Sequence, residues 1–254
     1  MLIILGPAKT IDPSPHGIDV SHTHPAHTDH ACELVDILRT LSPEQLKHLM
    51  KVSDKLAHAT FESLARWRPD PEPAEGTEAI LAFAGEVFNG LQARKLAKED
   101  LQFAQDRVRI LSGLYGVLRP LDLILPYRLE MGTALSSSRG RNLYEFWKDV
   151  IPAHIARETG LRKPPVLINL ASQEYLRSID PRSFPHRIIT PVFRESDGKT
   201  HRNVTIYAKK ARGMMLSFLL RNRITEPEYL KAFDMEGYAF QPLSSSGEEW
   251  HYYR

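Results

Sequence analysis

Short apolar runs alternate with helical patterns along the chain, and this alternation constrains the fold more than any other feature. The first run, Leu2 to Leu5, ends at Gly6-Pro7, a pair that breaks regular structure. Further strand candidates lie at residues 79–84, 107–112, 165–170, 187–193 and 204–208. Interleaved strands and helices predict a mixed α/β fold. No internal repeat divides residues 1–254, so we expect one domain.

Helical patterns fill the intervals between these runs. The strongest start signal is Ser42-Pro43-Glu44-Gln45, a capping box with proline at the first helical position. Residues 11–30 are rich in Pro, His, Ser and Thr and predict a loop. The predicted helices span residues 31–39, 43–50, 54–67, 86–95, 142–157, 211–220 and 226–233.

The composition is that of a globular protein, with 42% apolar and 25% charged residues. No run of eighteen apolar residues is present, and the N-terminal MLIILGPAK lacks a charged region before its short apolar stretch. Cys32 is the only cysteine, which excludes an internal disulfide and fits a reducing compartment. We therefore expect a cytoplasmic protein with no membrane partner.

Positive charge is concentrated between Arg182 and Arg223, although the net charge of the chain is only +2. This segment holds two anions, Glu195 and Asp197, against ten cations, a local balance of +8. The cations are Arg182, Arg187, Arg194, Lys199, Arg202, Lys209, Lys210, Arg212, Arg221 and Arg223. Such polarisation predicts a basic surface that binds phosphate groups.

Lys209, Lys210 and Arg212 follow the strand candidate at 204–208 and would occupy the start of the next helix. A helix N-terminus carries partial positive charge, so three cations there are unfavourable unless an anion binds among them. The pattern favours an anion site. The alternative is that the three side chains extend into solvent or pair with carboxylates.

A second phosphate-binding candidate is the segment 112–120, which has two glycines after a predicted strand and contains Arg119. Arg128 follows it, and both arginines lie in proline-flanked positions. Glycines let the backbone approach a ligand closely, and arginine is a bidentate phosphate donor. Lys9 lies in the loop after the first strand. The alternative is a structural turn in which these arginines pair with Asp122 or Glu130. The spacing matches no Walker loop.

Polar residues also lie at the end of the strand predicted at 165–170 and just after it, namely Asn169, Ser172 and Glu174. The carboxyl ends of strands are common positions for sites in α/β folds. Ser172 also fits a helix N-cap, which is a purely structural role.

Four histidines, His22, His24, His27 and His30, lie close together near Cys32. Their spacing lacks the rigid i, i+4 pair or the C-x₂-C pairs of strong metal motifs, so we predict no metal site. No Ser-His-Asp or Cys-His arrangement indicates a nucleophile.

Taken in order, the motifs PAKTID, LMKVSDKLA, FAGEVFNGL, LSGLYGVLRPLDLILPYRLEMG, LYEFW, INLASQEY and YAKKARGMM closely resemble the YaaA peroxide-stress family. The resemblance spans Pro7 to about Phe240. It implies a cytoplasmic protein that limits unincorporated iron during hydrogen peroxide stress. It also implies a single mixed α/β fold unlike the common superfolds, with a helix-hairpin-helix element and a positively charged cleft that bind DNA.

The helix-hairpin-helix element would lie within residues 43–67, where residues 49–57 are similar to the pattern L-P-G-I-G-x-x-x-A. Lys51 and Ser53 stand where that pattern has glycines. We expect the side chains of Lys51, Ser53 and Lys55 to replace part of the backbone contact with phosphate. An ordinary pair of helices joined by a turn is the alternative.

We favour a binding protein for double-stranded DNA that does not read sequence, without cofactor or metal. The expected phosphate contacts are Lys51, Ser53 and Lys55 in the hairpin, and Lys9, Arg119, Arg128, Lys209, Lys210 and Arg212 in a cleft. The rival is an enzyme acting on a small phosphorylated or nucleotide-like substrate, with Glu174 or Tyr115 as acid or base. A third hypothesis is direct iron sequestration by histidines and carboxylates.

Overall fold

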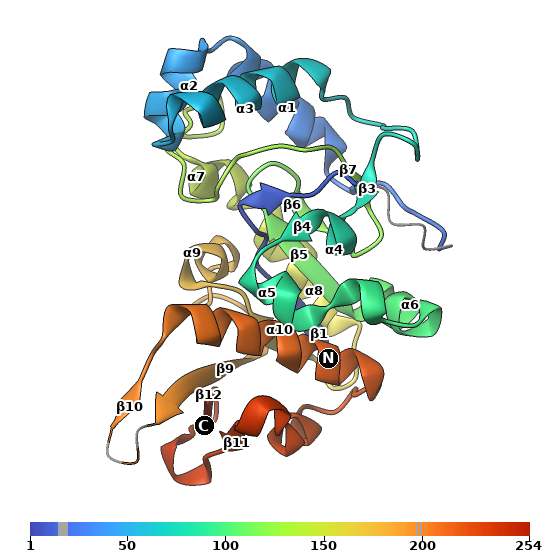
Figure 1. Ribbon diagram of the computed structural model, residues 1–254, viewed down its shortest axis with the longest axis vertical. Coiled ribbons are helices and arrows are strands. Elements are labelled where there is room, and N and C mark those ends of the chain that lie inside the picture. Colours follow the sequence, from blue (N-terminus) through green and yellow to red (C-terminus); the bar gives the residue numbers. More distant parts are fainter. Residues whose placement is uncertain (15–19, 197, 199) are drawn as a thin grey trace.

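The computed structural model describes residues 1–14, 20–196, 198 and 200–254. Within these residues an eight-stranded sheet has the order β11-β12-β9-β8-β1-β5-β6, with β10 paired to β9 (Figure 1). The central strands are parallel, and the outer ones β6, β10 and β11 are antiparallel. The strands are β1 (Leu2–Leu5), β5 (Val108–Ser112), β6 (Gly116–Leu118), β8 (Val166–Leu170), β9 (Arg187–Ser196), β10 (His201–Arg202), β11 (Ala239–Phe240) and β12 (Glu249–Tyr253).

Helices surround this sheet, and α1, α2 and α3 lie together at one end of the molecule (Figure 1). Two small antiparallel pairs, β2 (Thr10–Ile11) with β4 (Phe83–Ala84) and β3 (Thr77–Glu78) with β7 (Leu123–Ile124), lie beside the sheet. The helices are α1 (Thr28–Arg39), α2 (Pro43–Met50), α3 (Asp54–Arg66), α4 (Ala79–Ala82), α5 (Glu86–Leu91), α6 (Lys98–Arg107), α7 (Leu143–Trp147), α8 (Ile151–Gly160), α9 (Gln173–Leu176) and α10 (Thr205–Arg221).

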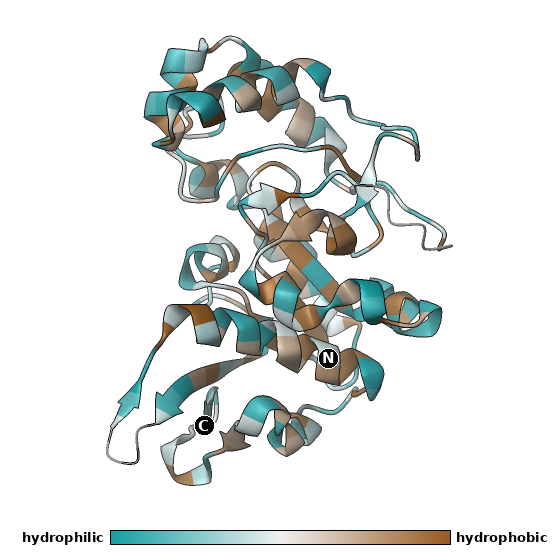
Figure 2. Ribbon diagram, in the orientation of Figure 1, coloured by the Kyte–Doolittle hydropathy of each residue, from teal (hydrophilic) through white to brown (hydrophobic). Residues whose placement is uncertain are grey.

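The core lies in the centre of the sheet, where Figure 2 shows the apolar residues concentrated. Every residue of β1 and β8 is buried, as is usual for parallel strands covered on both faces. Among the described helices, none combines the length and apolar character needed to cross a membrane.

Several sequence predictions are confirmed. The apolar run Leu2–Leu5 is β1, and the candidates at 107–112, 165–170 and 187–193 correspond to β5, β8 and β9. The capping box at the start of α2 is formed in both directions, because the Ser42 hydroxyl accepts from Gln45 N and the Gln45 side chain accepts from Ser42 N. The mixed α/β class is therefore correct.

The strand predicted at 204–208 is wrong. α10 begins at Thr205, so Lys209 and Lys210 lie in its second turn and Arg212 in its third. The alternation of Val204 to Ala208 imitates a strand, yet Ile206 and Tyr207 are exposed and bury no face. Because the helix dipole acts within the first turn, the argument that these cations meet a helix N-terminus no longer holds.

Other element predictions also need correction. Residues 79–84 form the short helix α4 followed by the two-residue strand β4, and not one strand. The helix expected at 142–157 is divided into α7 and α8, because Pro152 cannot continue a helix but is suited to its first turn. Residues 226–233 form a 3₁₀ helix, Pro227–Ala232. The helix α6 and the strand β12 were not predicted.

A turn of three residues joins α2 to α3 at the predicted hairpin. Lys51 ends α2 in the left-handed conformation, with φ of 53°. Ser53 caps α3, its hydroxyl accepting from Leu56 N at 3.4 Å. These residues form a pair of helices joined by a tight turn, and their assignment as a DNA-binding helix-hairpin-helix stays a prediction.

α5 and α10 approach each other more closely than side chains normally allow. Gly213 faces the carbonyl oxygen of Val87, and a Cβ added at Gly213 would lie 1.7 Å from that atom. Gly90 faces the carbonyl oxygen of Lys210 in the same way, at 2.1 Å from an added Cβ. Because these two glycines have no side chains, α5 can pack directly against the face of α10 that carries Lys209 and Arg212.

Candidate functional site

A cleft of about 380 Å³ lies at the carboxyl ends of the neighbouring parallel strands β1 and β8. We call it the β1–β8 cleft. In the sheet, β1 is next to β5 on one side and β8 is next to β9 on the other. The strand order thus reverses between β1 and β8, which is where open α/β sheets place ligands.

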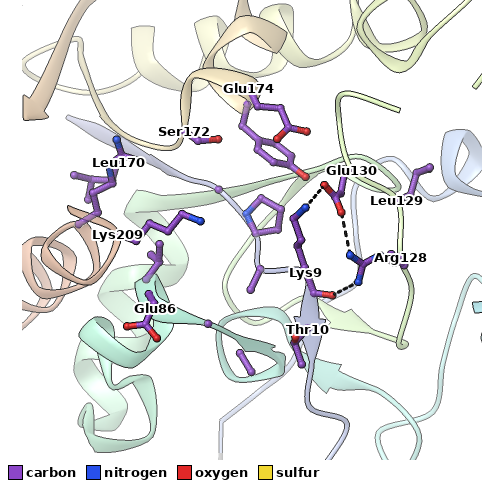
Figure 3. A pocket seen from close by; sticks show the side chains of 18 of the residues that line it. Lys9, Thr10, Glu86, Arg128, Leu129, Glu130, Leu170, Ser172, Glu174 and Lys209 are labelled. Atoms are coloured by element: carbon purple, nitrogen blue, oxygen red, sulfur yellow. Dashed lines mark hydrogen bonds and ion pairs between the residues drawn. The ribbon is translucent and has the colours of Figure 1, made fainter. Parts of the chain in front are cut away.

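Five separate segments bring charged side chains to this cleft (Figure 3). Lys9 comes from the loop after β1, and Arg128 from the segment after β7. Lys209 and Arg212 lie three residues apart on α10 and therefore share one face of that helix. The carboxylates that line the cleft are Glu86, Glu130 and Glu174.

On one side of the cleft two cations are paired with a single carboxylate. Lys9 Nζ lies 2.7 Å from Glu130 Oε2, and Arg128 Nη2 lies 3.2 Å from Glu130 Oε1. Arg128 Nη1 also donates to the carbonyl oxygen of Lys9 at 3.4 Å. Figure 3 shows these three residues joined on one wall. The structural alternative foreseen for Arg128, a pair with Glu130, is confirmed.

The opposite side carries uncompensated cations. Among the described residues, neither Lys209 nor Arg212 has a side-chain hydrogen bond or ion pair. Burial lowers the pKa of Arg212, and no carboxylate counteracts this effect. Partial burial of a guanidinium without a partner is unfavourable, so this wall is suited to an anionic ligand.

Glu174 and Ser172 border the cleft at the start of α9. Glu174 Oε1 accepts from Gly132 N at 2.9 Å, which orients the carboxylate. Ser172 occupies the N-cap position as predicted, but its hydroxyl makes no capping bond and lines the cleft. Asn169 is satisfied within the fold, since its amide donates to Thr190 Oγ1 and accepts from Ala171 N.

A second cavity, of about 230 Å³, adjoins the first. Arg128, Glu130 and Glu174 line both, and the second cavity continues to Lys51 at the end of α2. The hollow surface thus extends from α10 to the α2–α3 turn. Ser53 and Lys55 do not line either cavity.

Three other predicted residues lie elsewhere. Arg119 pairs with the buried Asp122, with Nε 3.3 Å from Oδ1. Lys210 pairs with Glu236 at 2.5 Å, on another face of α10. Tyr115 is buried and accepts from Trp67 Nε1 at 2.8 Å, and burial raises its pKa well above the usual range. The structure does not bring these three into the β1–β8 cleft.

The basic segment 182–223 does not form one continuous surface. Arg187 donates to the Gly247 carbonyl, Arg221 to the Lys95 carbonyl, and Arg223 lies 3.8 Å from Asp100. Asp197 and Lys199 lie outside the described residues. Of the described cations in this segment, Lys209 and Arg212 line the cleft.

The four histidines are dispersed over the loop and the start of α1. His27 bonds to His154, and His30 stacks on Trp147 with ring centroids 5.4 Å apart. In the part of the chain that the structure describes, no group of three or more His, Cys, Asp or Glu side chains could hold a metal ion.

Sequence reasoning missed Glu86, which stands in the first turn of α5 and borders the cleft beside Lys209 (Figure 3). Its position depends on the close α5–α10 contact, for which the glycines at 90 and 213 are the local signals.

Comparisons with known proteins show similarity along nearly the whole chain. The family model described as peroxide stress protein YaaA matches residues 1–243. A UPF0246 protein of Burkholderia cenocepacia is 45% identical over 256 residues, covering 100% of this chain and 98% of the relative. A UPF0246 protein of Ralstonia pickettii is 45% identical over 254 residues, covering 100% of this chain and 99% of the relative. The chain therefore belongs to the YaaA family of peroxide stress proteins.

Proposed function

We propose that this protein binds double-stranded DNA without reading its sequence, through the β1–β8 cleft and the α2–α3 turn. The observation that carries the proposal is the convergence of Lys9, Arg128, Lys209 and Arg212, from distant parts of the chain, on one hollow surface that continues to Lys51. Lysine and arginine contacts to phosphate supply sequence-independent affinity.

The proposal includes the role in peroxide stress that the family resemblance implies, namely limiting free intracellular iron. We test it by electron paramagnetic resonance of chelated iron in peroxide-treated cells that lack the native protein. Wild-type protein should lower the signal, and a Lys209→Ala, Arg212→Gln double variant should not. If both proteins lowered the iron signal equally, the role in limiting iron would not depend on the cleft.

The direct test is fluorescence anisotropy of a labelled duplex with increasing salt. Affinity should fall by about 10³-fold or more between about 50 and about 200 mM salt if six or more phosphates are contacted. Replacing Lys51, Lys209 or Arg212 should weaken binding to unrelated sequences equally. Each loss should lower the slope of log affinity against log salt by about one.

Lys148→Ala is the matched control, because Lys148 is exposed, lies at the end of α7 and lines neither cavity. It should leave both affinity and slope close to wild type. A flat salt dependence, or equal slopes for Lys148→Ala and Lys209→Ala, would contradict the proposal.

A second candidate function is chemistry on a small phosphorylated or nucleotide-like substrate. It is favoured by the carboxylate of Glu174, which the Gly132 amide orients beside the cations. The cleft volume also lies within the range of small-molecule sites, about 300–1,000 Å³. Thermal stabilisation by mononucleotides without any DNA affinity would favour this candidate.

A further inference from the structure

The β1–β8 cleft is electrostatically divided. On one wall Lys9 and Arg128 share the single carboxylate of Glu130, so both cations are engaged in ion pairs and the wall keeps one excess positive charge. The other wall has Lys209 and Arg212 without partners among the described residues, facing Glu86, whose Oε1 is held by the Asn89 amide. The cleft cations without an ion pair among the described residues therefore lie on the α10 wall.

Such a division is suited to one phosphate and unsuited to a row of phosphates. Glu174 stands between the α10 wall and the second cavity, since it lines both hollows. Its carboxylate repels a further phosphate that would follow the first along the cleft. A continuous nucleic-acid backbone would therefore place one phosphate favourably at Lys209 and Arg212 and a neighbouring phosphate unfavourably at Glu174.

The cleft is too small to enclose a duplex, which can contact only its rim. A cube of 380 Å³ has an edge of about 7 Å, and a B-DNA duplex is wider than its major groove, which alone measures about 12 Å. A single nucleotide removed from the base stack meets no such limit, because enzymes accept one extruded nucleotide in pockets closed to the duplex. The cleft is also lined by Pro7, Leu170 and the ring of Tyr175, which offer apolar surface.

We propose that the β1–β8 cleft receives one unstacked nucleotide, with its phosphate between Lys209 and Arg212 and its neutral part toward Glu174 and Ser172. The carboxylate of Glu174 and the free hydroxyl of Ser172 accept hydrogen bonds from sugar hydroxyls or base amino groups. The burial of Arg212 without a carboxylate partner is then offset by the phosphate.

This inference rests on the proposed DNA binding and states which DNA the cleft selects. One unstacked nucleotide can come from two sources, a phosphorylated strand end or an unpaired internal nucleotide. In both, the duplex remains outside and contacts the surface near Lys51. Fully paired DNA without ends can make only the outer contacts.

The test compares three labelled DNAs of one sequence at constant salt. The first is a covalently closed dumbbell whose two ends are joined by non-nucleotide linkers, so that every nucleotide is paired. The second is the same duplex with open 5′-phosphorylated ends, and the third is the dumbbell with one unpaired nucleotide. We expect at least tenfold tighter binding of the second, the third or both. The better of the two identifies the source of the nucleotide.

The double variant Lys209→Ala, Arg212→Gln should lose this preference while retaining weak binding to the closed dumbbell. Lys148→Ala should keep the preference, and circular dichroism melting checks that each variant is folded. Equal affinity for all three DNAs would overturn the inference and leave DNA binding intact. A preference that survives in the double variant would also overturn it. Absence of binding to any of the three would instead refute the proposed function on which the inference rests.

Discussion

His27 Nε2 lies 3.0 Å from His154 Nδ1, and this contact joins the residue before α1 to α8 across 127 positions of the chain. The chain of polar contacts continues from His154 to Glu158 at 3.5 Å and from Glu158 to the buried Arg109 at 2.6 Å. Burial would raise the pKa of Glu158, but hydrogen bonds from His154 and Arg109 outweigh it and lower the pKa to about 2. The carboxylate of Glu158 therefore stays charged at pH values well above about 2.

The His27 contact predicts that stability falls in mild acid. Burial, followed by the nearby charges of His154 and His30, lowers the pKa of His27 from 6.5 to about 4. Between these values the unfolded chain binds the proton and the folded chain does not. The free energy of unfolding should therefore fall as pH is lowered from about 6.5 toward 4. The melting temperature measured by differential scanning calorimetry checks this.

His27→Gln should make that decline shallower, since glutamine does not titrate. His58→Gln is the control, because His58 is exposed and bonds only to the Asp54 carbonyl of its own helix. Equal pH dependence of wild type and His27→Gln would show that His27 is not responsible.

Gly213→Ala should destabilise the protein by at least about 1–3 kcal/mol, because the new methyl group must displace the Val87 carbonyl. Alanine is otherwise the better helix former by about 1 kcal/mol, so a purely local effect would have the opposite sign. Urea unfolding measures the change. The displaced α10 should also weaken DNA binding, because it carries Lys209 and Arg212.

Gly247→Ala is the matched substitution at a glycine with no atom within 4 Å of an added Cβ. We expect a change within about 0.5 kcal/mol. A stabilised Gly213→Ala variant would show that the close α5–α10 contact does not constrain the fold.

Tyr115→Phe should cost about 1–3 kcal/mol, because it leaves the buried Trp67 Nε1–H without its acceptor. Affinity for DNA should not change, since Tyr115 lies outside the cleft. Urea unfolding and anisotropy on one preparation separate the two effects. Tyr229→Phe, at a side chain that is 64% exposed, should alter neither. If Tyr115→Phe abolished turnover of a phosphorylated or nucleotide-like substrate and left the free energy of unfolding unchanged, Tyr115 would again be a catalytic candidate.

Lys209→Ala and Lys210→Ala should behave differently although they are adjacent. Lys210 pairs with Glu236, which also pairs with Arg254 at 2.8 Å. Loss of the Lys210 side chain should therefore lower the stability of the C-terminal segment by up to about 1 kcal/mol. It should leave the salt slope of DNA binding unchanged. Lys209→Ala should lower the slope and leave stability unchanged. Limited proteolysis of the C-terminal segment measures the first effect and anisotropy the second.

Elements with a local signal were predictable from the sequence. The buried run of β1 and the Ser42 capping box depend on neighbouring residues only, and both are formed as expected. The start of α10 was not predictable in this way. Val204, Ile206 and Ala208 alternate with the period of a strand, but Ile206 is exposed and the helix is stabilised by later residues packed on α5.

The site shows the same limit. Arg119 and Arg128 have equivalent sequence settings, yet Arg119 is held by Asp122 while Arg128 lines the cleft. Both arginines meet a nearby carboxylate, but whether the pair lies in the cleft depends on the path of the chain between them. Lys9, Arg128, Lys209 and Arg212 could be named from residue type, whereas the division of charge by Glu130 required the tertiary structure.

The Lys9–Arg128 contact joins positions 119 residues apart, and the α10 wall adds a third segment to the same cleft. An anion bound there acts as a removable cross-link between the start, the middle and the later part of the chain. At a ligand concentration of 100 times Kd, such binding raises the free energy of unfolding by about 2.7 kcal/mol. The population of intact, protease-resistant molecules would then rise and fall with the supply of ligand.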